Sequence, residues 1–249
     1  MSTVNTPVIE TTSAPALIAV PLPQAPGKNR LPVFIEEDVL IPDWVVDHDS
    51  YRHWAKSDEF PTRGRFSFID GMIWVDRTME EFFSHNLVKT EYTVVVGQVV
   101  RSSPRGYFGS DGNLWTHPAV GISTEPDGLY FSYETLTSGR IRLIKGAQKG
   151  YIELEGTPDM ILEIVSNSSV KKDTQIEKEK CAKAGVSEYW LVDARGAEPR
   201  FQIWGLQAGA YQLAADDNGW LTSSVFGKAF KLEYGKDPLG HPSFQLLVR

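Results

Sequence analysis

Two apolar runs with a polar, lysine-rich segment between them constrain the fold of this chain most strongly. The first run, Met160-Ile-Leu-Glu-Ile-Val165, is almost continuously apolar and has the length of a strand, which is typical of a strand covered on both faces. A helix is predicted from about Val170 to Ala184, with Gly185 as its left-handed stop. Glu188–Asp193 is a second strand of the buried type. This order predicts two parallel, neighbouring strands joined by a right-handed crossover.

Strands predicted on either side of this unit make the sheet mixed. Arg65–Ile69 and Met72–Asp76 flank Asp70-Gly71, and an Asp-Gly pair between two strands is the strongest short-range signal for a hairpin. Further strands are predicted at residues 128–132, 140–144, 150–155, 201–204, 210–213 and 230–232. We therefore predict an α/β fold, a mixed β-sheet flanked by helices, in one domain over residues 31–249.

Residues 1–30 differ from the rest of the chain in composition. They contain five prolines among Ser, Thr and Ala, a composition that does not support a packed element. We predict a flexible Pro-rich tail, with a docking segment for a partner as the alternative.

A second helix is predicted from about Met79 to Val100, because Thr78-Met-Glu-Glu81 fits a capping box. Its apolar stripe consists of Phe83, Leu87, Val88, Val95 and Val99. This stripe leaves His85 either facing a site or on the solvated side of the helix, and we slightly favour the solvated side.

Charge and cysteine content narrow the possible functions. The net charge of −7 counts against tight non-specific binding of nucleic acid, although it leaves room for a local basic groove. The single cysteine, Cys181, forms neither an internal disulfide nor a thiolate metal site, so any metal must be held by oxygen or imidazole. The sequence shows no apolar run of membrane-spanning length and no secretory leader. We expect a cytoplasmic protein.

Glu163 requires an explanation, because an ionised carboxylate inside an apolar strand is costly unless it is paired, hydrogen-bonded or bound to a cation. Strand alternation places Asp159 on the same face. A second acid, Asp127, lies in Glu125-Pro-Asp-Gly128 at the start of a predicted strand, although this motif alone indicates a turn. Asp127 and Glu163 together offer oxygens for one hard cation such as Mg²⁺. The alternatives for Glu163 are an edge strand in water or a buried ion pair with an arginine.

Four lysines follow the Glu163 strand: Lys171, Lys172, Lys178 and Lys180. Such a cluster usually forms a solvated helix face, but an ammonium group here would stabilise an attacking hydroxide and a pentavalent phosphate. The sequence has no phosphate-cradling Gly-rich loop, no zinc signature and no Gly-x-Ser-x-Gly elbow. This disfavours NTPases, zinc hydrolases and serine hydrolases.

Several motifs occur in an order that resembles a known family. The most specific are Thr157-Pro-Asp-Met-Ile-Leu-Glu-Ile-Val-Ser166, Ser168-Ser-Val-Lys-Lys-Asp173 and Ala184-Gly-Val-Ser-Glu-Tyr-Trp-Leu-Val-Asp193. Upstream stand Arg65-Phe-Ser-Phe-Ile-Asp-Gly71, Ser84-His-Asn86 and Glu125-Pro-Asp-Gly128. Over about residues 60–235 the chain resembles the Uma2 family, bacterial proteins regarded as endonucleases with the restriction-endonuclease-like PD-(D/E)XK fold.

The resemblance implies a nuclease that holds Mg²⁺, or alternatively Mn²⁺, and hydrolyses DNA by water attack on a phosphodiester bond. By motif match the metal ligands are Asp127, Glu163 and the backbone carbonyl of Ile164. The superfamily usually has a lysine where this chain has Val165. The resemblance implies that the catalytic lysine has moved into the following helix.

The two candidates for that lysine are Lys172 and Lys178, and the sequence does not choose between them. A homodimer is expected by analogy with nucleases that pair to cut two strands.

Two other functions stay open. Many members of the family have Glu where this chain has Ser67, which motivates the hypothesis of a catalytically inactive nuclease-fold protein with a binding or assembly role. A third hypothesis is a toxin-like or defence component that acts through the Pro-rich tail.

Overall fold

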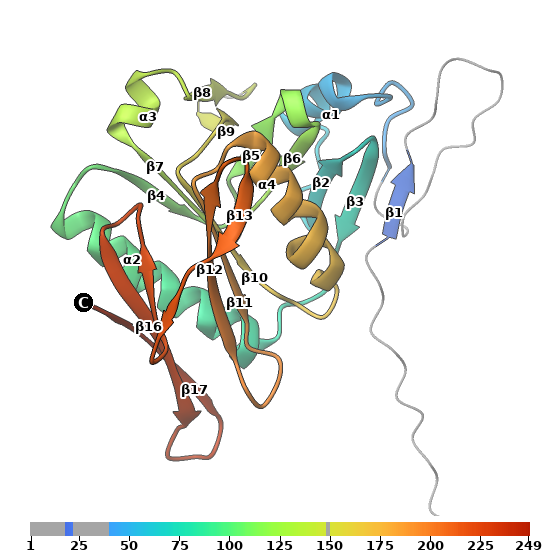
Figure 1. Cartoon of the computed structure of the whole chain (residues 1–249). Coiled ribbons are helices and arrows are strands. Elements are labelled where there is room, and N and C mark those ends of the chain that lie inside the picture. Colours follow the sequence, from blue (N-terminus) through green and yellow to red (C-terminus); the bar gives the residue numbers. More distant parts are fainter. Residues whose placement is uncertain (1–17, 22–39, 148–149) are drawn as a thin grey trace, which may run out of the picture.

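The structure is a computed structural model that describes residues 18–21, 40–147 and 150–249. Its described strands form three sheets (Figure 1). The first sheet has the order β1 (Ile18–Pro21), β3 (Met72–Asp76), β2 (Arg65–Ile69), β6 (Ile122–Thr124), β5 (Leu114–His117), β9 (Tyr151–Gly156) and β8 (Ile141–Lys145). The second has the order β13 (Ala210–Leu213), β12 (Arg200–Gln207), β11 (Glu188–Asp193), β10 (Met160–Ile164), β7 (Gly128–Ser132) and β4 (Gly106–Ser110). The third has the order β14 (Asp216–Asp217), β15 (Trp220–Ser223), β16 (Lys228–Lys236) and β17 (Pro242–Val248).

The helical segments are short apart from one. They are α1 (His48–Ala55), η1 (Phe82–Leu87), α2 (Val88–Ser102), η2 (Pro118–Val120), α3 (Tyr133–Thr137), η3 (Lys172–Glu177) and α4 (Lys178–Ala184). The predicted class, a mixed β-sheet flanked by helices, is confirmed, although the strands are divided among three sheets. No helix among the described residues is long and apolar enough to cross a membrane.

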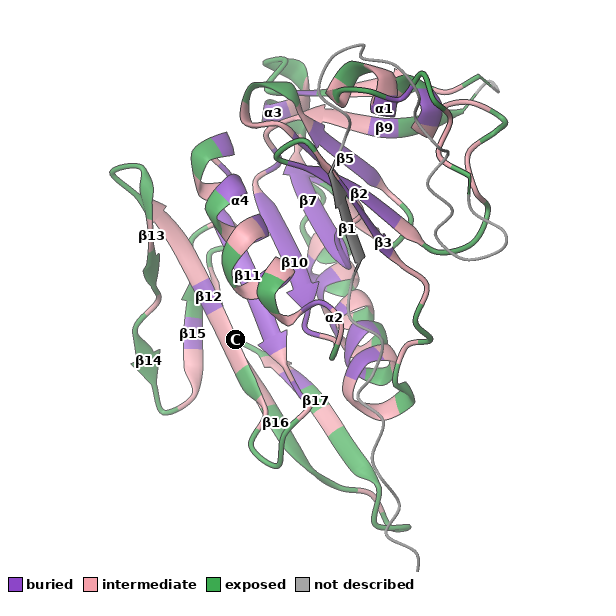
Figure 2. Cartoon of the chain, turned by 90° about the vertical axis from the view of Figure 1, so that its right-hand side faces the viewer, coloured by how far each residue is buried: buried purple, intermediate pink, exposed green. Residues whose placement is uncertain are grey.

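The six-stranded sheet carries the buried strands that the sequence predicts. β10 pairs in parallel with β11 and antiparallel with β7. Leu162 and Ile164 pack on the side of α2, whereas Ile161 and Val165 pack on the side of α4. Figure 2 shows β7, β10 and β11 buried along most of their length, while the β16–β17 hairpin is largely exposed. Glu163 therefore points to the α4 side of a strand that is covered on both faces.

The predicted β2–β3 hairpin is confirmed. Ile69 pairs with Met72, and Asp70 and Gly71 have φ values of 53° and 75°. Positive φ at both central residues is the geometry of a type I′ turn, whose twist matches that of the two strands. This hairpin carries Arg65 toward the sheet edge where β7 begins.

The helix predicted from Met79 begins later, and the predicted capping box is wrong. Glu81 is the N-cap residue of η1, where its carboxylate accepts a hydrogen bond from the backbone N–H of Ser84. Thr78 instead donates from its hydroxyl to Asp76 Oδ1 at 2.6 Å. Glu80 pairs with Arg65 at 2.6 Å, and residues 77–81 lie outside any helix or strand.

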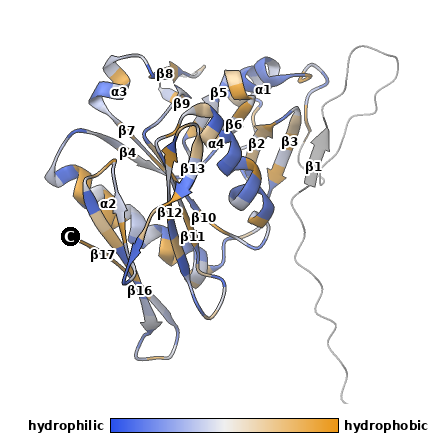
Figure 3. Cartoon of the chain, in the orientation of Figure 1, coloured by the Kyte–Doolittle hydropathy of each residue, from blue (hydrophilic) through white to orange (hydrophobic). Residues whose placement is uncertain are grey.

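The helix after β10 contains a π-helical segment that the apolar pattern does not predict. Helical backbone begins at Val170, continues as the π-helix η3 and ends as α4 at Gly185, whose φ of 79° confirms the predicted stop. In Figure 3 α4 is mostly hydrophilic, yet Cys181 and Ala184 are buried against the six-stranded sheet. π-helical turns are rare and frequently occur at functional sites.

The C-terminal part has three strands that were not predicted, β14, β15 and β17. They join the predicted strand near residue 230 because Leu221, Phe230 and Leu246 extend the apolar core on the α2 side. At the other end of the chain, Ile18–Pro21 pairs with β3 as β1, so these four residues of the predicted tail form a strand. The rest of residues 1–30 lies outside the described residues, and the predicted domain boundaries stay a prediction.

Candidate active site

Asp127 lies directly before β7 and is 1% exposed. Its Oδ2 accepts a hydrogen bond from the backbone N–H of Ile164 at 2.9 Å and lies 3.5 Å from His85 Nε2. Its Oδ1 lies 3.1 Å from Arg65 Nη1 and 3.8 Å from Lys89 Nζ. Three cationic or ionisable nitrogens therefore converge on one buried carboxylate.

These neighbours determine the ionisation of Asp127. Burial is the largest influence and opposes the charged form, but the hydrogen bond with His85 and the charges of Arg65, His85 and Lys89 outweigh it. The pKa of Asp127 is consequently well below its ordinary value. For His85, burial lowers the pKa, but Asp127 and Glu80 outweigh burial and raise it.

Asp127 and Glu163 line the same small cavity, called here the inner cavity, together with Ile164, Lys172 and Asp173. Its volume is about 20 Å³, which is room for one water molecule or one small ion. Glu163 Oε1 is buried there and accepts no hydrogen bond from the described residues, whereas the buried Asp127 Oδ1 has the ion-pair contacts with Arg65 and Lys89. A buried carboxylate oxygen without a donor, as on Glu163, is the observation that fits a cation.

Ile164 also faces this cavity. Its N–H donates to Asp127, whereas the N–H of Val165 donates to Val192 of β11. Because the N–H and C=O groups of one strand residue point to the same side, the carbonyl of Ile164 faces the side of Asp127.

Glu163 belongs to a second, fully buried acidic group with Asp173 and Glu177, whose ligand atoms all lie within 4.8 Å of one another. Lys172 is the counter-charge: its Nζ lies 2.8 Å from Asp173 Oδ1 and donates to Glu177 Oε2 at 2.6 Å. In a π-helix residues five positions apart are brought together, and Lys172 and Glu177 have this spacing. Asp127 belongs to a different group of this kind, with Glu80 and His85.

This acidic group is electrostatically unfavourable when all its members are charged. Burial and the charge of Glu177 raise the pKa of Glu163 well above its ordinary value. Burial also raises the pKa of Asp173 to about 6, although Lys172 opposes that shift. Burial lowers the pKa of Lys172, but Asp173, Glu177 and Glu163 outweigh burial and raise it.

The raised pKa of Asp173 predicts a dependence of stability on pH. A carboxyl whose pKa rises from 3.8 to about 6 on folding stabilises the folded state fully below about pH 4, and this contribution is lost as the pH rises through about 6. The free energy of unfolding of the metal-free protein should therefore fall over this range relative to that of Asp173→Asn, by on the order of 2–3 kcal/mol. Urea unfolding in EDTA at a series of pH values measures this difference. Parallel curves for the two proteins would contradict it.

The other residues singled out in the sequence lie elsewhere. Lys178 is outside the inner cavity, with its Nζ 3.9 Å from the centre of the Trp204 ring. Lys180 contacts Asp70 and donates to the carbonyl of Val120 at 2.7 Å. Asp159 accepts a hydrogen bond from the backbone N–H of Ser132, the N-cap residue of α3, at 2.6 Å. Of the two candidate lysines, only Lys172 lies with Glu163.

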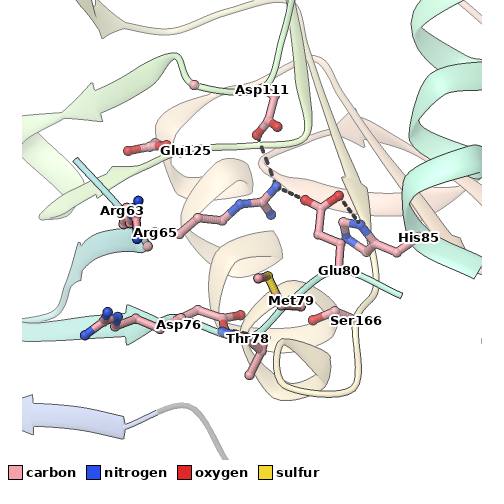
Figure 4. Close-up of a pocket in the computed structure, with 13 residues that line it drawn as sticks. Arg63, Arg65, Asp76, Thr78, Met79, Glu80, His85, Asp111, Glu125 and Ser166 are labelled. Atoms are coloured by element: carbon pink, nitrogen blue, oxygen red, sulfur yellow. Dashed lines mark hydrogen bonds and ion pairs between the residues drawn. The ribbon is translucent and has the colours of Figure 1, made fainter. Parts of the chain in front are cut away.

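A larger, open cavity adjoins the inner cavity and is called the outer cavity (Figure 4). Its volume is about 700 Å³, and both cavities share Arg65, His85 and Glu125 among their lining residues. Figure 4 shows the Arg65 guanidinium between Asp111 and Glu80. Its Nη2 lies 3.1 Å from Asp111 Oδ1 and 2.6 Å from Glu80 Oε1. The inner cavity thus lies next to a space wide enough for a polyanionic ligand, with an arginine at the junction.

The sequence analysis missed several residues of this site, and its slight preference for the solvated side for His85 is wrong. His85 is 2% exposed and Lys89 is 8% exposed, and both face Asp127. The signal was present in the spacing, because His85 and Lys89 continue the buried stripe of Tyr92, Val96 and Val99 by steps of three and four. His85 and Lys89, the polar residues at the start of this buried stripe, therefore indicated the position of the site.

Comparisons with known proteins agree with the fold. A model of the Uma2 family, described as "Putative restriction endonuclease", matches residues 48–233. The chain is also similar in structure to a crystal structure described as "a putative nuclease belonging to DUF820 from Anabaena variabilis ATCC 29413". The TM-score is 0.53 at 18% sequence identity, and the match covers 73% of this chain and 91% of that chain. No curated protein matches the chain. The restriction-endonuclease-like fold predicted from the sequence is confirmed.

Proposed function

Because this chain belongs to the Uma2 family, we propose that it is a metal-dependent endonuclease that hydrolyses phosphodiester bonds in DNA. The observation that carries the proposal is the inner cavity, where Asp127, Glu163 and Lys172 meet. Two buried carboxylates beside an ammonium group are the parts that metal-assisted phosphodiester hydrolysis needs. The adjoining outer cavity supplies the space for a nucleic acid strand.

The residues that would hold Mg²⁺, or Mn²⁺ in its place, are Asp127, Glu163 and the carbonyl of Ile164. Carboxylate and carbonyl oxygens are the ligands these hard cations prefer. When bound, the cation lowers the pKa of a coordinated water and neutralises charge on the scissile phosphate. The buried Glu163 oxygen without a donor supports this assignment.

The protein's own side chains prepare this site for a phosphate. Arg65, His85 and Lys89 keep Asp127 ionised and in one position. Asp173 and Glu177 keep the Lys172 ammonium charged and in one position. This ammonium adds positive charge where negative charge develops on the phosphate. Arg65 lines both cavities and is placed to orient the entering strand.

Nicking of supercoiled plasmid DNA tests the proposal. Wild-type protein is expected to nick with Mg²⁺ or Mn²⁺ and to stop nicking when EDTA is added. Glu163→Ala should abolish nicking because it removes one of two carboxylate ligands, whereas His117→Ala, outside both cavities, should retain it. If wild-type protein and Glu163→Ala both fold and neither nicks DNA, the nuclease function is refuted.

One observation favours the second candidate, a catalytically inactive protein that uses this fold for binding or assembly. Arg65 and Lys89 already pair with Asp127, and they compete with a cation for the same carboxylate. Calorimetric titration with Mg²⁺ separates the two functions. A nuclease should bind Mg²⁺ and lose this binding in Glu163→Ala, whereas for the inactive protein the substitution should make no difference. The homodimer and the cytoplasmic location stay predictions.

A further inference from the structure

A third cavity, called here the aromatic cavity, lies outside the metal site. Its volume is about 450 Å³, within the range of small-molecule pockets and large enough for one nucleoside. Its lining residues include three aromatic rings, two cations and one amide: Phe83, Tyr234, Phe244, Arg195, Lys236 and Asn167. They come from η1, the turn after β10, the loop after β11 and the β16–β17 hairpin.

The topology places this cavity beside the proposed site. β10 and β11 are parallel neighbours, so their carboxyl ends meet at one edge of the sheet. Ser166, after β10, lines both cavities of the proposed site, and Arg195, after β11, lines the aromatic cavity. The consecutive pairs Ser166-Asn167 and Glu80-Glu81 each contribute one residue to the outer cavity and the next to the aromatic cavity. A strand that leaves the outer cavity along this edge therefore meets the aromatic cavity next.

Three aromatic rings line this cavity: Phe83, Tyr234 and Phe244. Tyr234 and Phe244 are directly opposed across β16 and β17, and Tyr234 is 51% exposed. Phe83 is held in place by His241, whose ring is stacked on it with centroids 5.1 Å apart. Aromatic side chains of this kind bind bases with little dependence on sequence, because each base has a π-face.

Apart from Glu81, whose carboxylate accepts from Ser84, the polar groups of the cavity match the rest of a nucleotide. Arg195 is fixed by Asp193, which accepts from Nε at 2.9 Å and from Nη2 at 2.8 Å. Its Nη1 reaches Asn167 Oδ1 at only 3.4 Å, which leaves donor capacity for a ligand. Lys236, exposed at the end of β16, forms no ion pair with any described residue and offers a charge for a phosphate.

From this arrangement we infer that the aromatic cavity binds one unpaired base of the nucleic acid, close to the phosphodiester bond that the proposed site cleaves. The inference rests on the proposed function, since it names the form of that function's substrate. A base inside a duplex keeps both faces stacked and its edge paired, so only an unpaired or flipped base can enter. The preferred substrate is therefore a duplex with a single-stranded extension or an unpaired nucleotide, rather than a fully paired duplex.

Binding without cleavage tests this inference. The probes are a fully paired DNA duplex and the same duplex with a single-stranded extension that carries 2-aminopurine, both in EDTA. Wild-type protein should bind the extended duplex about tenfold more tightly, the effect of one stacked base, and should quench the 2-aminopurine fluorescence. Tyr234→Ala should remove both effects and leave the affinity for the paired duplex unchanged. Leu239→Ala, at the exposed tip of the same hairpin, is the matched control and should behave as wild type.

Each outcome decides between the two proposals. Equal losses for both duplexes in Tyr234→Ala, or no loss for either, would overturn the inference, because the cavity would then be a general backbone contact or the docking surface of another molecule. Wild-type protein that binds and quenches but cleaves no DNA with Mg²⁺ would refute the nuclease and leave the base site standing. Cleavage of DNA without quenching of 2-aminopurine would support the nuclease and refute the base site. Thermal melting of each variant confirms that it is folded.

Discussion

Lys172→Gln is expected to lower the rate of DNA cleavage by roughly 10²–10³-fold, while Lys178→Gln leaves it nearly unchanged. Lys172 lies in the inner cavity with Asp127 and Glu163, where its charge is retained by Asp173 and Glu177. Removing one fixed charge that faces the developing phosphate charge has an effect of this size. Lys178 instead lies over the Trp204 ring, so its loss costs about 1 kcal/mol of stability and no catalysis.

These two variants are a matched pair, because both change a lysine of the same helical segment to the same neutral residue. Initial rates of plasmid nicking with Mg²⁺ give the comparison, and far-ultraviolet circular dichroism shows that both proteins are folded. Loss of activity in Lys178→Gln with full activity in Lys172→Gln would reverse the assignment. Equal rates in both variants would remove lysine from the mechanism.

Asp127→Asn and Glu163→Gln should change the stability of the metal-free protein in opposite directions, although both residues are proposed ligands of one cation. Asp127→Asn removes the negative charge among Arg65, His85 and Lys89, which should cost about 3 kcal/mol and lower Tm by roughly 10 °C. Glu163→Gln removes a buried charge that its acidic neighbours disfavour. It should stabilise the protein by on the order of 1 kcal/mol while abolishing cleavage, as is common for strained functional sites.

The pH dependence of these two effects differs in sign. The pKa of Asp127 is lowered on folding, so its stabilisation is present above its ordinary value of 3.8 and is lost as the pH falls through the folded value. The pKa of Glu163 is raised. Its stabilisation is therefore complete below its ordinary value of 4.5 and is lost as the pH rises through the folded value. The gain from Glu163→Gln should thus grow with pH.

Thermal unfolding in EDTA, at one acidic and one mildly alkaline pH, measures both changes. Glu188→Gln is the matched control, since Glu188 is a buried carboxylate on the neighbouring strand β11. It accepts hydrogen bonds from Trp190, Ser223, Ser224 and Val225. Because its oxygens are satisfied, the same isosteric change there should destabilise the protein. If Glu163→Gln behaved like Glu188→Gln, Glu163 would be a structural residue.

Local patterns predicted much of the frame around the site. The buried strand at residues 160–165, the turn at Asp70-Gly71 and the helix stop at Gly185 are all present. Each depends on residues within a few positions, since side-chain period and backbone preference act over that range. The family resemblance added Asp127 and Glu163 as a pair, and both residues line one cavity.

The start of η1 shows where local patterns stop being sufficient. Thr78 and Glu81 have the spacing of a capping box, but Asp76 takes the Thr78 hydroxyl and Arg65 takes the neighbouring Glu80. The Glu81 carboxylate itself accepts from the backbone N–H of Ser84 as the N-cap. These competing partners of Thr78 and Glu81 replace the capping box.

The sequence alone was enough for the β2–β3 hairpin, the strand–helix–strand unit of β10 and β11, the buried acid in β10 and the family. Packing decided which of the two lysines lies in the inner cavity: Lys172 meets Glu177 across a π-helical turn, whereas Lys178 lies over the Trp204 ring. Strand period and turn chemistry come from adjacent residues, whereas the partner of a charged side chain comes from distant parts of the chain. Its ionisation, and therefore its chemistry, depends on those long-range contacts and on exclusion from water.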